Sequence, residues 1–560
     1  MLQELNQLRR LYYGDNLDVL REHIASDSVD LVYLDPPFNS NANYNILFKS
    51  PAGKAADSQI EAFEDTWHWN DKAEAAFHDV MTCGNTDVAE LLRAMRGFLK
   101  ENDMMAYLAM MAARLIELHR VLKPTGSLYL HCDPTASHYL KLLLDGVFGG
   151  DRFRSEIVWK RTSAHNSAKR WGPIHDTILF ATKSADYTWN RTYTPYDEEY
   201  VRKYYRHSDS QGRKYRLSDL TASGTRNGES GKEWNGFDPT KHGRHWGIPQ
   251  IVKDLFPNAP EGIKTLGWLD LLSEHGLIEM TGDGVGWPHF RRYLDKMEGQ
   301  SPQDIIDDIP PLSQRHAERL GYPTQKPLAL LERIIQASSN EGDVVLDPFC
   351  GCGTAIDAAQ KLNRQWIGID VTHLSIGLIE RRMKDRYGED LAYLVIGTPN
   401  DLASAQKLAA DEPHQFQYWI TQAIDGQPYQ GGRKGADRGI DGYLYFTGHD
   451  RKTEAAIISV KAGRNVGVAM VRDLKGVIER EKSPIGIFIC AVNPTREMER
   501  EAAAAGVYQG ADGRTYPRLQ IFTLAEYFQR LRPKVPLLDR QAAYKKAARV
   551  DDSAKQGVLI

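Results

Sequence analysis

An acidic residue followed by two prolines and an aromatic residue comes directly after a short apolar run. The run is Leu31–Leu34, and the residues after it are Asp35, Pro36, Pro37 and Phe38. The prolines restrict the backbone to extended geometry, and the Asp35–Pro36 bond has no amide proton that would occupy a neighbouring carbonyl group. A carboxylate and a carbonyl placed this way can each accept one N–H bond from a planar amine. This arrangement favours methylation of a poorly nucleophilic exocyclic amine, whose lone pair is then directed at the incoming methyl group.

Phe38 suits the same chemistry because an aromatic ring can stack on a nucleobase. An enzyme that acts on a base of duplex DNA must first take that base out of the helix. We therefore expect base flipping and direct in-line transfer, with no covalent enzyme intermediate. Taken alone, the same four residues are as typical of a plain junction between a strand and a turn.

A second loop, late in the chain, combines an acidic residue with two glycines. Val344–Leu346 is an apolar run, and it leads into Asp347, Pro348, Phe349, Cys350, Gly351, Cys352, Gly353 and Thr354. The glycines let a ligand approach the backbone, and Asp370, at the end of the next apolar run, can accept bonds from ribose hydroxyls. A nicotinamide enzyme is the obvious alternative, but the three-glycine fingerprint of that class is absent. The carboxylate of Asp347 favours a cofactor with a cationic amino-acid end over an anionic pyrophosphate.

Together the two loops resemble those of the DNA amino-methyltransferases, which make N6-methyladenine or N4-methylcytosine. The acidic loop precedes the glycine loop, so the order resembles the permuted β class of that family. The resemblance implies a Rossmann-like α/β methyltransferase fold, S-adenosylmethionine as cofactor, double-stranded DNA as partner, and a catalytic loop of Asp35, Pro36, Pro37 and Phe38. It also implies a set of cofactor-binding residues: Asp15, Asn16, Thr324, Lys326, Asp347, Pro348, Phe349, Gly351, Gly353, Thr354 and Asp370.

Two shorter segments extend the resemblance. Gly14–Asn16 is similar to the family segment that contacts the cofactor's adenosine. Tyr322–Pro327 is similar to the family motif ahead of the glycine loop, which implies that Thr324 and Lys326 lie near the cofactor's methionine carboxylate. In the family, Asp before the two prolines favours adenine and Ser favours cytosine. We therefore expect adenine N6 as the target, with cytosine N4 as the alternative. Protein-glutamine methyltransferases use Asn where Asp35 stands, which argues against that class.

These loops need strands that end at one edge of a sheet. Two helix-like stretches, 104–122 and 328–339, alternate with short β-branched or aromatic-rich runs. The runs are Val29–Leu34, Ser127–Leu130, Glu156–Lys160, Thr177–Ala181, Val344–Leu346 and Gln365–Ile369. The alternation predicts an α/β domain with a largely parallel sheet.

We divide the chain into five parts by pattern and composition. They are a methyltransferase catalytic half (1–190), an inserted target-recognition region (191–320), a cofactor-binding half (321–400), a smaller C-terminal α/β restriction-endonuclease-like domain (410–530) and a tail (531–560). The insertion has no clear period and interleaves aromatic with basic residues, which can stack on bases and neutralise phosphates. Its expected DNA contacts are Arg202, Lys203, Arg206, Arg213, Lys214, Arg216 and Arg244.

The C-terminal part carries an acidic residue and a lysine on two runs that read as a hairpin, 439–446 and 455–461. Asp441 and Lys461 would lie roughly opposite each other, with Ser459 on the same face as Lys461. The segment resembles the Mrr-like branch of the PD-(D/E)xK restriction endonucleases, which implies Mg²⁺ held through Asp441 if the domain is active. Ser459 departs from that family, because a neutral hydroxyl is a weak ligand for a hard cation. Cleavage, and a module that binds without cutting, therefore both stay open.

Composition limits the remaining classes. The chain has 560 residues, a net charge of −4 and five scattered cysteines, so a disulfide framework and a structural zinc site are not expected. No apolar run approaches the length of a membrane span, and we expect a cytoplasmic protein that associates with the nucleoid through DNA. A homodimer and a subunit of a restriction or defence complex stay open, as do a bifunctional methyltransferase–endonuclease and a DNA-binding subunit that is active only in a complex.

Overall fold

The computed structural model describes most of the chain. The described residues are 9–37, 68–162, 169, 171–282, 286–313, 316–320, 322, 324–429, 439–449, 452–463, 465–536 and 538, with the backbone of β3 (Asn43–Leu47) and β4 (Gln59–Glu64). Residues 191–302 form one compact unit, and the rest of the chain forms a second, larger unit. No helix within these ranges is both long and apolar enough to cross a membrane.

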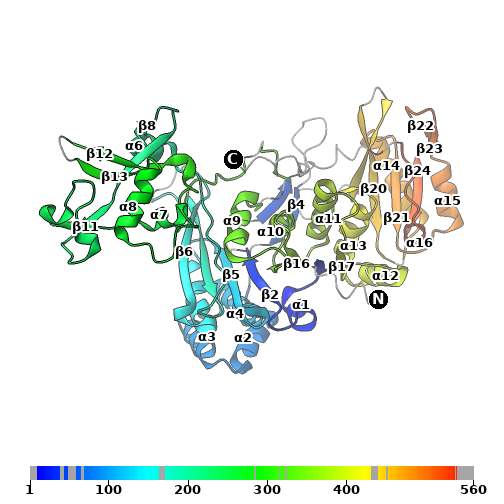
Figure 1. The fold of residues 1–560 in the computed structure, drawn as a ribbon. Helices are drawn as coiled ribbons and strands as arrows, with labels where there is room; N and C mark the ends of the chain where they lie inside the picture. The colour runs from blue at the N-terminus through cyan, green and yellow to red at the C-terminus, as the bar shows by residue number, and fades with distance from the viewer. Residues whose placement is uncertain are drawn as a thin grey trace. The chain divides into compact units, whose positions relative to one another are not determined.

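A nine-stranded sheet forms the centre of the larger unit (Figure 1). Its strands, in spatial order, are β14 (Ile305–Ile306), β6 (Phe153–Lys160), β7 (His175–Thr182), β5 (Leu122–Cys132), β2 (Val29–Leu34), β15 (Val344–Asp347), β16 (Gln365–Asp370), β1 (Arg10–Tyr13) and β17 (Leu394–Ile396). All neighbours are parallel except β7, which is antiparallel to β5 and β6. The predicted α/β class with a largely parallel sheet is confirmed.

Helices cover both faces of this sheet, and its central strands are accordingly rich in apolar residues. One face packs on α1 (Asn16–His23), α2 (Asp71–Thr82), α3 (Thr86–Leu99), α4 (Asp103–Val121) and α5 (Ser137–Phe148); the other packs on α9 (Leu328–Ser338), α10 (Thr354–Lys361) and α11 (His373–Tyr387). Successive residues of β2 alternate between the two cores: Val32 and Leu34 join the first, Leu31 and Tyr33 the second. The expected helices 104–122 and 328–339 correspond to α4 and α9.

The smaller unit has a core and sheets of its own. A four-stranded sheet contains β12 (Ile278–Thr281), β13 (Trp287–Tyr293), β9 (Lys214–Asp219) and β8 (His207–Ser208), and β10 (Thr221–Ser223) pairs with β11 (Arg244–Trp246). The helices are α6 (Glu198–Tyr204), α7 (Gln250–Leu255) and α8 (Thr265–Glu274). These elements are short, which is why the sequence shows no clear period here. The unit ends at Pro302, before the expected boundary at 320, because Ile305 and Ile306 pair with β6 of the large sheet.

The C-terminal segment builds a second α/β layer structure. Its sheet runs β18 (Gln427–Pro428), β19 (Gly442–Thr447), β20 (Thr453–Lys461), β21 (Gly486–Cys490) and β24 (Leu519–Thr523). One face packs on α12 (Leu402–Asp411) and α13 (Pro413–Ala423), the other on α14 (Val468–Arg480) and α15 (Arg496–Ala503). A hairpin of β22 (Val507–Gln509) and β23 (Thr515–Pro517) and the helix α16 (Leu524–Phe528) complete it. Most of the expected tail lies outside the described residues.

Candidate active site

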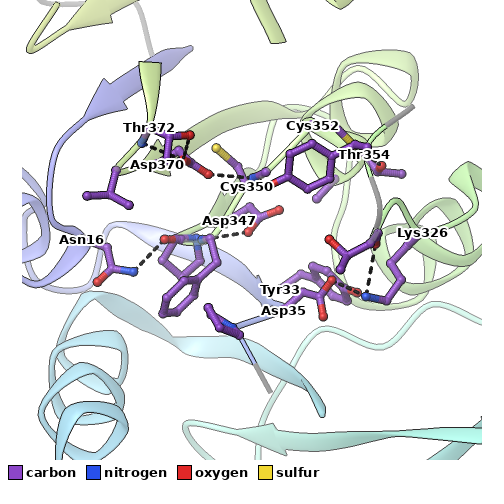
Figure 2. Close-up of a pocket in the computed structure, with 18 of the residues that line it drawn as sticks. Asn16, Tyr33, Asp35, Lys326, Asp347, Cys350, Cys352, Thr354, Asp370 and Thr372 are labelled. Atoms are coloured by element: carbon purple, nitrogen blue, oxygen red, sulfur yellow. Dashed lines mark hydrogen bonds and ion pairs between the residues drawn. The ribbon is translucent and has the colours of Figure 1, made fainter. Parts of the chain in front are cut away.

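A cavity of about 310 Å³ opens at the carboxyl ends of β2, β15 and β16, where parallel strands of an open sheet collect ligands. Figure 2 shows its wall, to which both predicted loops contribute. The predicted residues that line it are Asp15, Asn16, Asp35, Pro37, Thr324, Lys326, Asp347, Pro348, Phe349, Gly351, Thr354 and Asp370. Pro36 and Gly353 are not among the lining residues, and Phe38 lies outside the described residues.

The two oxygens of Asp35 have different surroundings. Oδ2 forms an ion pair with the ammonium group of Lys326, which lies 3.4 Å from the carbonyl oxygen of Thr324. Oδ1 is buried and has no hydrogen-bond partner among the described residues. A buried acceptor without a partner is unusual in a folded protein and suits a ligand that brings an N–H donor.

Lys326 contacts the acidic loop directly. Its side chain, 9% exposed, pairs with Asp35, and the contact with a cofactor carboxylate that the family resemblance implied stays a prediction. The cation therefore serves the acidic loop in this structure, and it fixes one carboxylate oxygen while the other stays available.

The glycine loop turns sharply between β15 and α10. Gly351 and Gly353 have φ values of +49° and +73°, a region that glycine adopts without strain. A side chain on Gly351 would meet the ring of Tyr322, and one on Gly353 would meet Ile379 at 2.7 Å. Gly351 thus keeps the cavity open, whereas Gly353 allows α10 to pack closely on α11.

Asp370 anchors the same loop from β16. Its Oδ2 accepts a bond from the backbone N–H of Gly351 at 2.9 Å, and its Oδ1 accepts bonds from the N–H and hydroxyl of Thr372. Oδ2 accepts one bond and so retains a second lone pair for a ligand hydroxyl. Asp370 therefore holds the loop in shape and still faces the cavity.

Two buried arginines, which the sequence analysis missed, brace the glycine loop at its two ends. Arg114 of α4 donates to Asn16, whose amide donates in turn to the carbonyl oxygen of Pro348 at 2.8 Å. Arg382 of α11 donates to the carbonyl oxygen of Cys352 at 3.0 Å and pairs with the buried Asp357. The charge of Arg114 within the otherwise uncharged run 104–116 was the available signal, because such a charge needs a partner.

Asp15 and Asn16 link this bracing to the start of α1. Asp15 accepts a bond from the N–H of Leu17 as the N-cap and forms an ion pair with Arg114 at 2.8 Å. Both residues line the cavity, so the turn expected to contact a cofactor is held rigidly by α4.

Several acidic side chains gather around the cavity. Burial raises the pKa of Asp347 well above its ordinary value, and the neighbouring carboxylates of Asp35 and Asp370 raise it further. Burial also raises the pKa of Asp370. A ligand that carries positive charge would stabilise the ionised forms of these groups, whereas an anionic ligand would be repelled.

The predicted DNA contacts lie in the smaller unit and fall into two groups by the partners of their side chains. Arg202, Lys203, Arg206 and Lys214 are exposed and form no ion pair with the residues that the structure describes. The other three are engaged within the unit. Arg213 pairs with Asp209, Arg216 donates to the hydroxyl of Tyr200, and Arg244 donates to Thr221. The first group thus has no paired carboxylate among the described residues, whereas side chains of the unit bind the second.

The C-terminal domain brings its three predicted residues together at the start of β19 and the end of β20. Nζ of Lys461 lies 3.9 Å from Oδ2 of Asp441. That oxygen already accepts bonds from the hydroxyl of Ser459 at 3.2 Å and from the N–H of Val460 at 2.6 Å. No group of three His, Cys, Asp or Glu side chains suited to a metal ion occurs within the described ranges.

Comparison with known proteins supports both resemblances. A family model described as DNA methylase matches residues 29–380, and one described as restriction endonuclease matches residues 408–512. The two-part relationship predicted from the motifs is confirmed.

Individual relatives cover different shares of the chain. Type II methyltransferase M.EcaI from Enterobacter cloacae is 34% identical over 278 residues, 50% of this chain and 57% of that protein. The Type III restriction-modification enzyme StyLTI Mod subunit from Salmonella typhimurium is 27% identical over 365 residues, 63% of this chain and 50% of that protein. DNA adenine methyltransferase YhdJ from Escherichia coli is 24% identical over 413 residues, 73% of this chain and 95% of that protein. The chain thus spans about half the length of the first two relatives.

Proposed function

Because this chain belongs to the DNA methylase family, whose model matches residues 29–380, we propose that it methylates an exocyclic amino group of a base in double-stranded DNA. The observation that carries this proposal is Oδ1 of Asp35, a buried acceptor with no partner in the described part of the chain. It lies in the wall of the cavity to which the glycine loop also contributes. An amino group on a flipped base would supply the missing N–H donor.

S-adenosylmethionine is the methyl donor that fits this cavity. When bound, it supplies a methyl group activated by a positively charged sulfur. Its cationic groups suit the carboxylate of Asp347, and a ribose hydroxyl suits the remaining lone pair on Oδ2 of Asp370. Asp15, Asn16 and the glycine loop would hold it, while the buried arginines keep these segments in place.

Asp35 has the central role in the transfer. Its Oδ1 accepts a hydrogen bond from an N–H of the target amino group and directs the nitrogen lone pair away from the carboxylate. The N–C bond would form as the methyl–sulfur bond breaks, and the nitrogen would then lose one proton, which Oδ1 can take up and pass to water. Lys326 keeps Oδ2 in a fixed position throughout. Stacking of the base on Phe38 remains a prediction.

Adenine N6 is the target that we infer. Asp rather than Ser stands before the two prolines, and one relative that covers most of the chain is named as an adenine methyltransferase. Cytosine N4 is the alternative, since both amines present the same N–H geometry to Asp35.

The inserted unit 191–302 is the part that we propose reads the DNA sequence. Its exposed basic residues Arg202, Lys203, Arg206 and Lys214 suit a phosphate backbone. The aromatic side chains around them, such as Tyr204, which is 44% exposed, suit contact with bases or sugars.

The C-terminal domain does not fit a metal-dependent nuclease in its described residues. Of the three predicted nuclease residues, Asp441 is the one with a carboxylate. Two groups of the protein already donate hydrogen bonds to Oδ2 of Asp441. Mg²⁺ prefers several oxygen ligands, usually including more than one carboxylate. We therefore propose that this domain does not cleave DNA through these residues. Mg²⁺-dependent cleavage that disappears in Asp441→Ala would contradict this proposal.

Expression in a host that lacks DNA methylation tests the main proposal directly. Sequencing of the host DNA that distinguishes N6-methyladenine from N4-methylcytosine should report N6-methyladenine at one short motif. Unmethylated DNA, despite soluble protein that binds S-adenosylmethionine, would overturn the proposal. N4-methylcytosine would overturn only the choice of base.

A further inference from the structure

Helix α13 of the C-terminal domain packs against α11 of the methylase fold. α13 lies within residues 408–512, which the restriction endonuclease model matches. α11 begins directly after the cavity-lining run 370–372. Gln422 of α13 donates to the carbonyl oxygen of Leu374 at 3.2 Å, and Gly377 leaves room for the Gln422 side chain. A helix of one domain therefore lies against the helix that starts at the cavity of the other.

One contact of α13 fixes the start of α11. Oε1 of Gln415 accepts a bond from the backbone N–H of His373 at 3.2 Å. His373 is the first residue of α11, so this N–H has no partner within the helix. The residue before it, Thr372, donates its N–H and its hydroxyl to Oδ1 of Asp370 (Figure 2). Gln415 thus holds the turn that carries Asp370 at the edge of the cavity.

A second contact starts at Glu412, which directly precedes α13. Its carboxylate accepts a bond from the hydroxyl of Tyr13 at 3.1 Å, and the ring of Tyr13 stacks on His373 with centroids 3.7 Å apart. Gly14, the next residue, lines the cavity and donates its N–H to the carbonyl oxygen of Asp370 at 3.0 Å. This contact therefore reaches the same edge of the cavity from β1.

A third contact packs behind the glycine loop. Tyr418 of α13, 9% exposed, belongs to an apolar cluster with Tyr322, Cys352, Leu374 and Leu378. Tyr322 and Cys352 line the cavity, whereas Tyr418 does not. Because buried side chains are close-packed, removal of the Tyr418 ring should let the wall in front of it shift.

Resting on the proposed function, we propose that α13 of the restriction-endonuclease-like domain supports the cavity that binds S-adenosylmethionine, with Gln415 and Tyr418 as positioning residues. Neither side chain lines the cavity. They act on cofactor affinity by holding the start of α11 and the wall around Tyr322 in place. This role makes the domain a working part of the methyltransferase and requires no DNA cleavage.

Isothermal titration of the full-length protein with S-adenosylmethionine tests the role of Tyr418. Tyr418→Ala should weaken cofactor binding by at least about five-fold, the lower end of couplings between two sites of one protein. Tyr418→Phe should keep an affinity close to that of the wild type, because the ring that fills the cluster remains.

Val471→Ala is the matched control for a loosened C-terminal domain. Val471 of α14 is fully buried in the core on the other face of the same sheet. Its replacement should lower the melting temperature and leave cofactor affinity intact. An affinity loss in Val471→Ala as large as that in Tyr418→Ala would overturn the proposal.

Gln415 gives a second test, which holds even if Tyr418→Ala does not fold. Gln415→Ala removes the acceptor for one backbone N–H and should weaken cofactor binding by about two- to ten-fold. Gln415→Glu should keep the wild-type affinity, because a carboxylate oxygen accepts the same bond and negative charge is favourable at the start of a helix.

Steady-state kinetics separate support of the cavity from damage to the reaction itself. In both alanine variants the KM for S-adenosylmethionine should rise. The KM for DNA, and kcat at saturating cofactor, should keep their wild-type values, because neither change touches Asp35 or the inserted unit. A lower kcat with an unchanged KM for the cofactor would overturn the proposal.

Wild-type cofactor affinity in Gln415→Ala, or in a folded Tyr418→Ala, would also overturn the proposal. A wild-type protein that binds S-adenosylmethionine but methylates no DNA would overturn the proposed function alone, since the calorimetric affinities still decide the role of α13. A wild-type protein that does not bind the cofactor would overturn both.

Discussion

Asp35 and Lys326 show how much of the proposed chemistry depends on single atoms. The carboxylate has one oxygen in an ion pair and one buried oxygen without a partner in the described residues. A fully paired aspartate would have nothing to offer a ligand, and a fully exposed one would be hydrated. The asymmetry therefore suits an acceptor that is preorganised for an incoming N–H group.

Asp347 leads to a prediction about protons. Because its pKa is raised in the folded protein, mainly by burial, the unfolded chain loses this proton first. Stability from this group therefore falls as pH rises from the ordinary carboxyl value of about 4 towards the raised value. A cationic cofactor favours the ionised form, so its affinity should rise with pH over the same window and binding should release protons. Calorimetry in buffers of different ionisation enthalpy measures this release.

Asp347→Asn supplies the control, since an amide has no proton to release. Most of the release should disappear in that variant, with a loss of affinity. Equal proton release in the two proteins would show that another group titrates and that Asp347 does not contact the cationic part of the cofactor.

At the scale of elements, α4 connects the core to the site. Thirteen of its side chains are buried, and Arg114 is the charged one among them. It forms bonds with Asp15 and Asn16, and through Asn16 it reaches the carbonyl oxygen of Pro348. A helix that fills the core thereby fixes the first turn of α1 and the glycine loop relative to each other.

Replacing Arg114 with methionine should weaken cofactor binding by about ten-fold, the equivalent of one hydrogen bond to a charged group. Isothermal titration with S-adenosylmethionine measures the change. Arg120 of the same helix is the matched control, because it donates to Leu20 and Ile24 away from the cavity. Arg120→Met should lower the melting temperature and leave cofactor affinity intact. Equal affinity losses in both variants would indicate general loosening of α4 rather than a role for Arg114.

Sequence reasoning located the strands and the two loops because their signals are local. Leu31–Leu34 followed by Asp35, or Val344–Leu346 followed by the glycine loop, can be read from adjacent residues. Arg114 on Asn16 and His131 between Tyr33 and Asp176 could not be predicted in this way. Those contacts depend on strand order and register, which bring together residues about a hundred positions apart.

For the molecule as a whole, the chain combines a methylase fold, an inserted unit and a restriction-endonuclease-like domain. Because the net charge is −4, the protein as a whole does not attract DNA electrostatically. Local basic surfaces must supply the attraction. The exposed residues Arg202, Lys203, Arg206 and Lys214 suit that role in the inserted unit.

Changing these four residues to alanine should weaken duplex binding and reduce its salt dependence. If each contacts one phosphate, the slope of log affinity against log salt should fall in magnitude by about 3 to 4. Fluorescence anisotropy at several salt concentrations measures the slope. Cofactor affinity should stay at the wild-type value. An unchanged slope would exclude this surface as the phosphate contact.

A methyl-transfer assay of Asp35→Ala tests the central claim most directly. It uses purified protein, labelled S-adenosylmethionine and duplex DNA that contains the target motif in unmethylated form. The variant should lose activity by about a hundred- to ten-thousand-fold, while calorimetry shows cofactor affinity close to that of the wild type. Because Asp35 is the proposed acceptor for the target amine, a variant that methylates DNA at the wild-type rate would contradict the account.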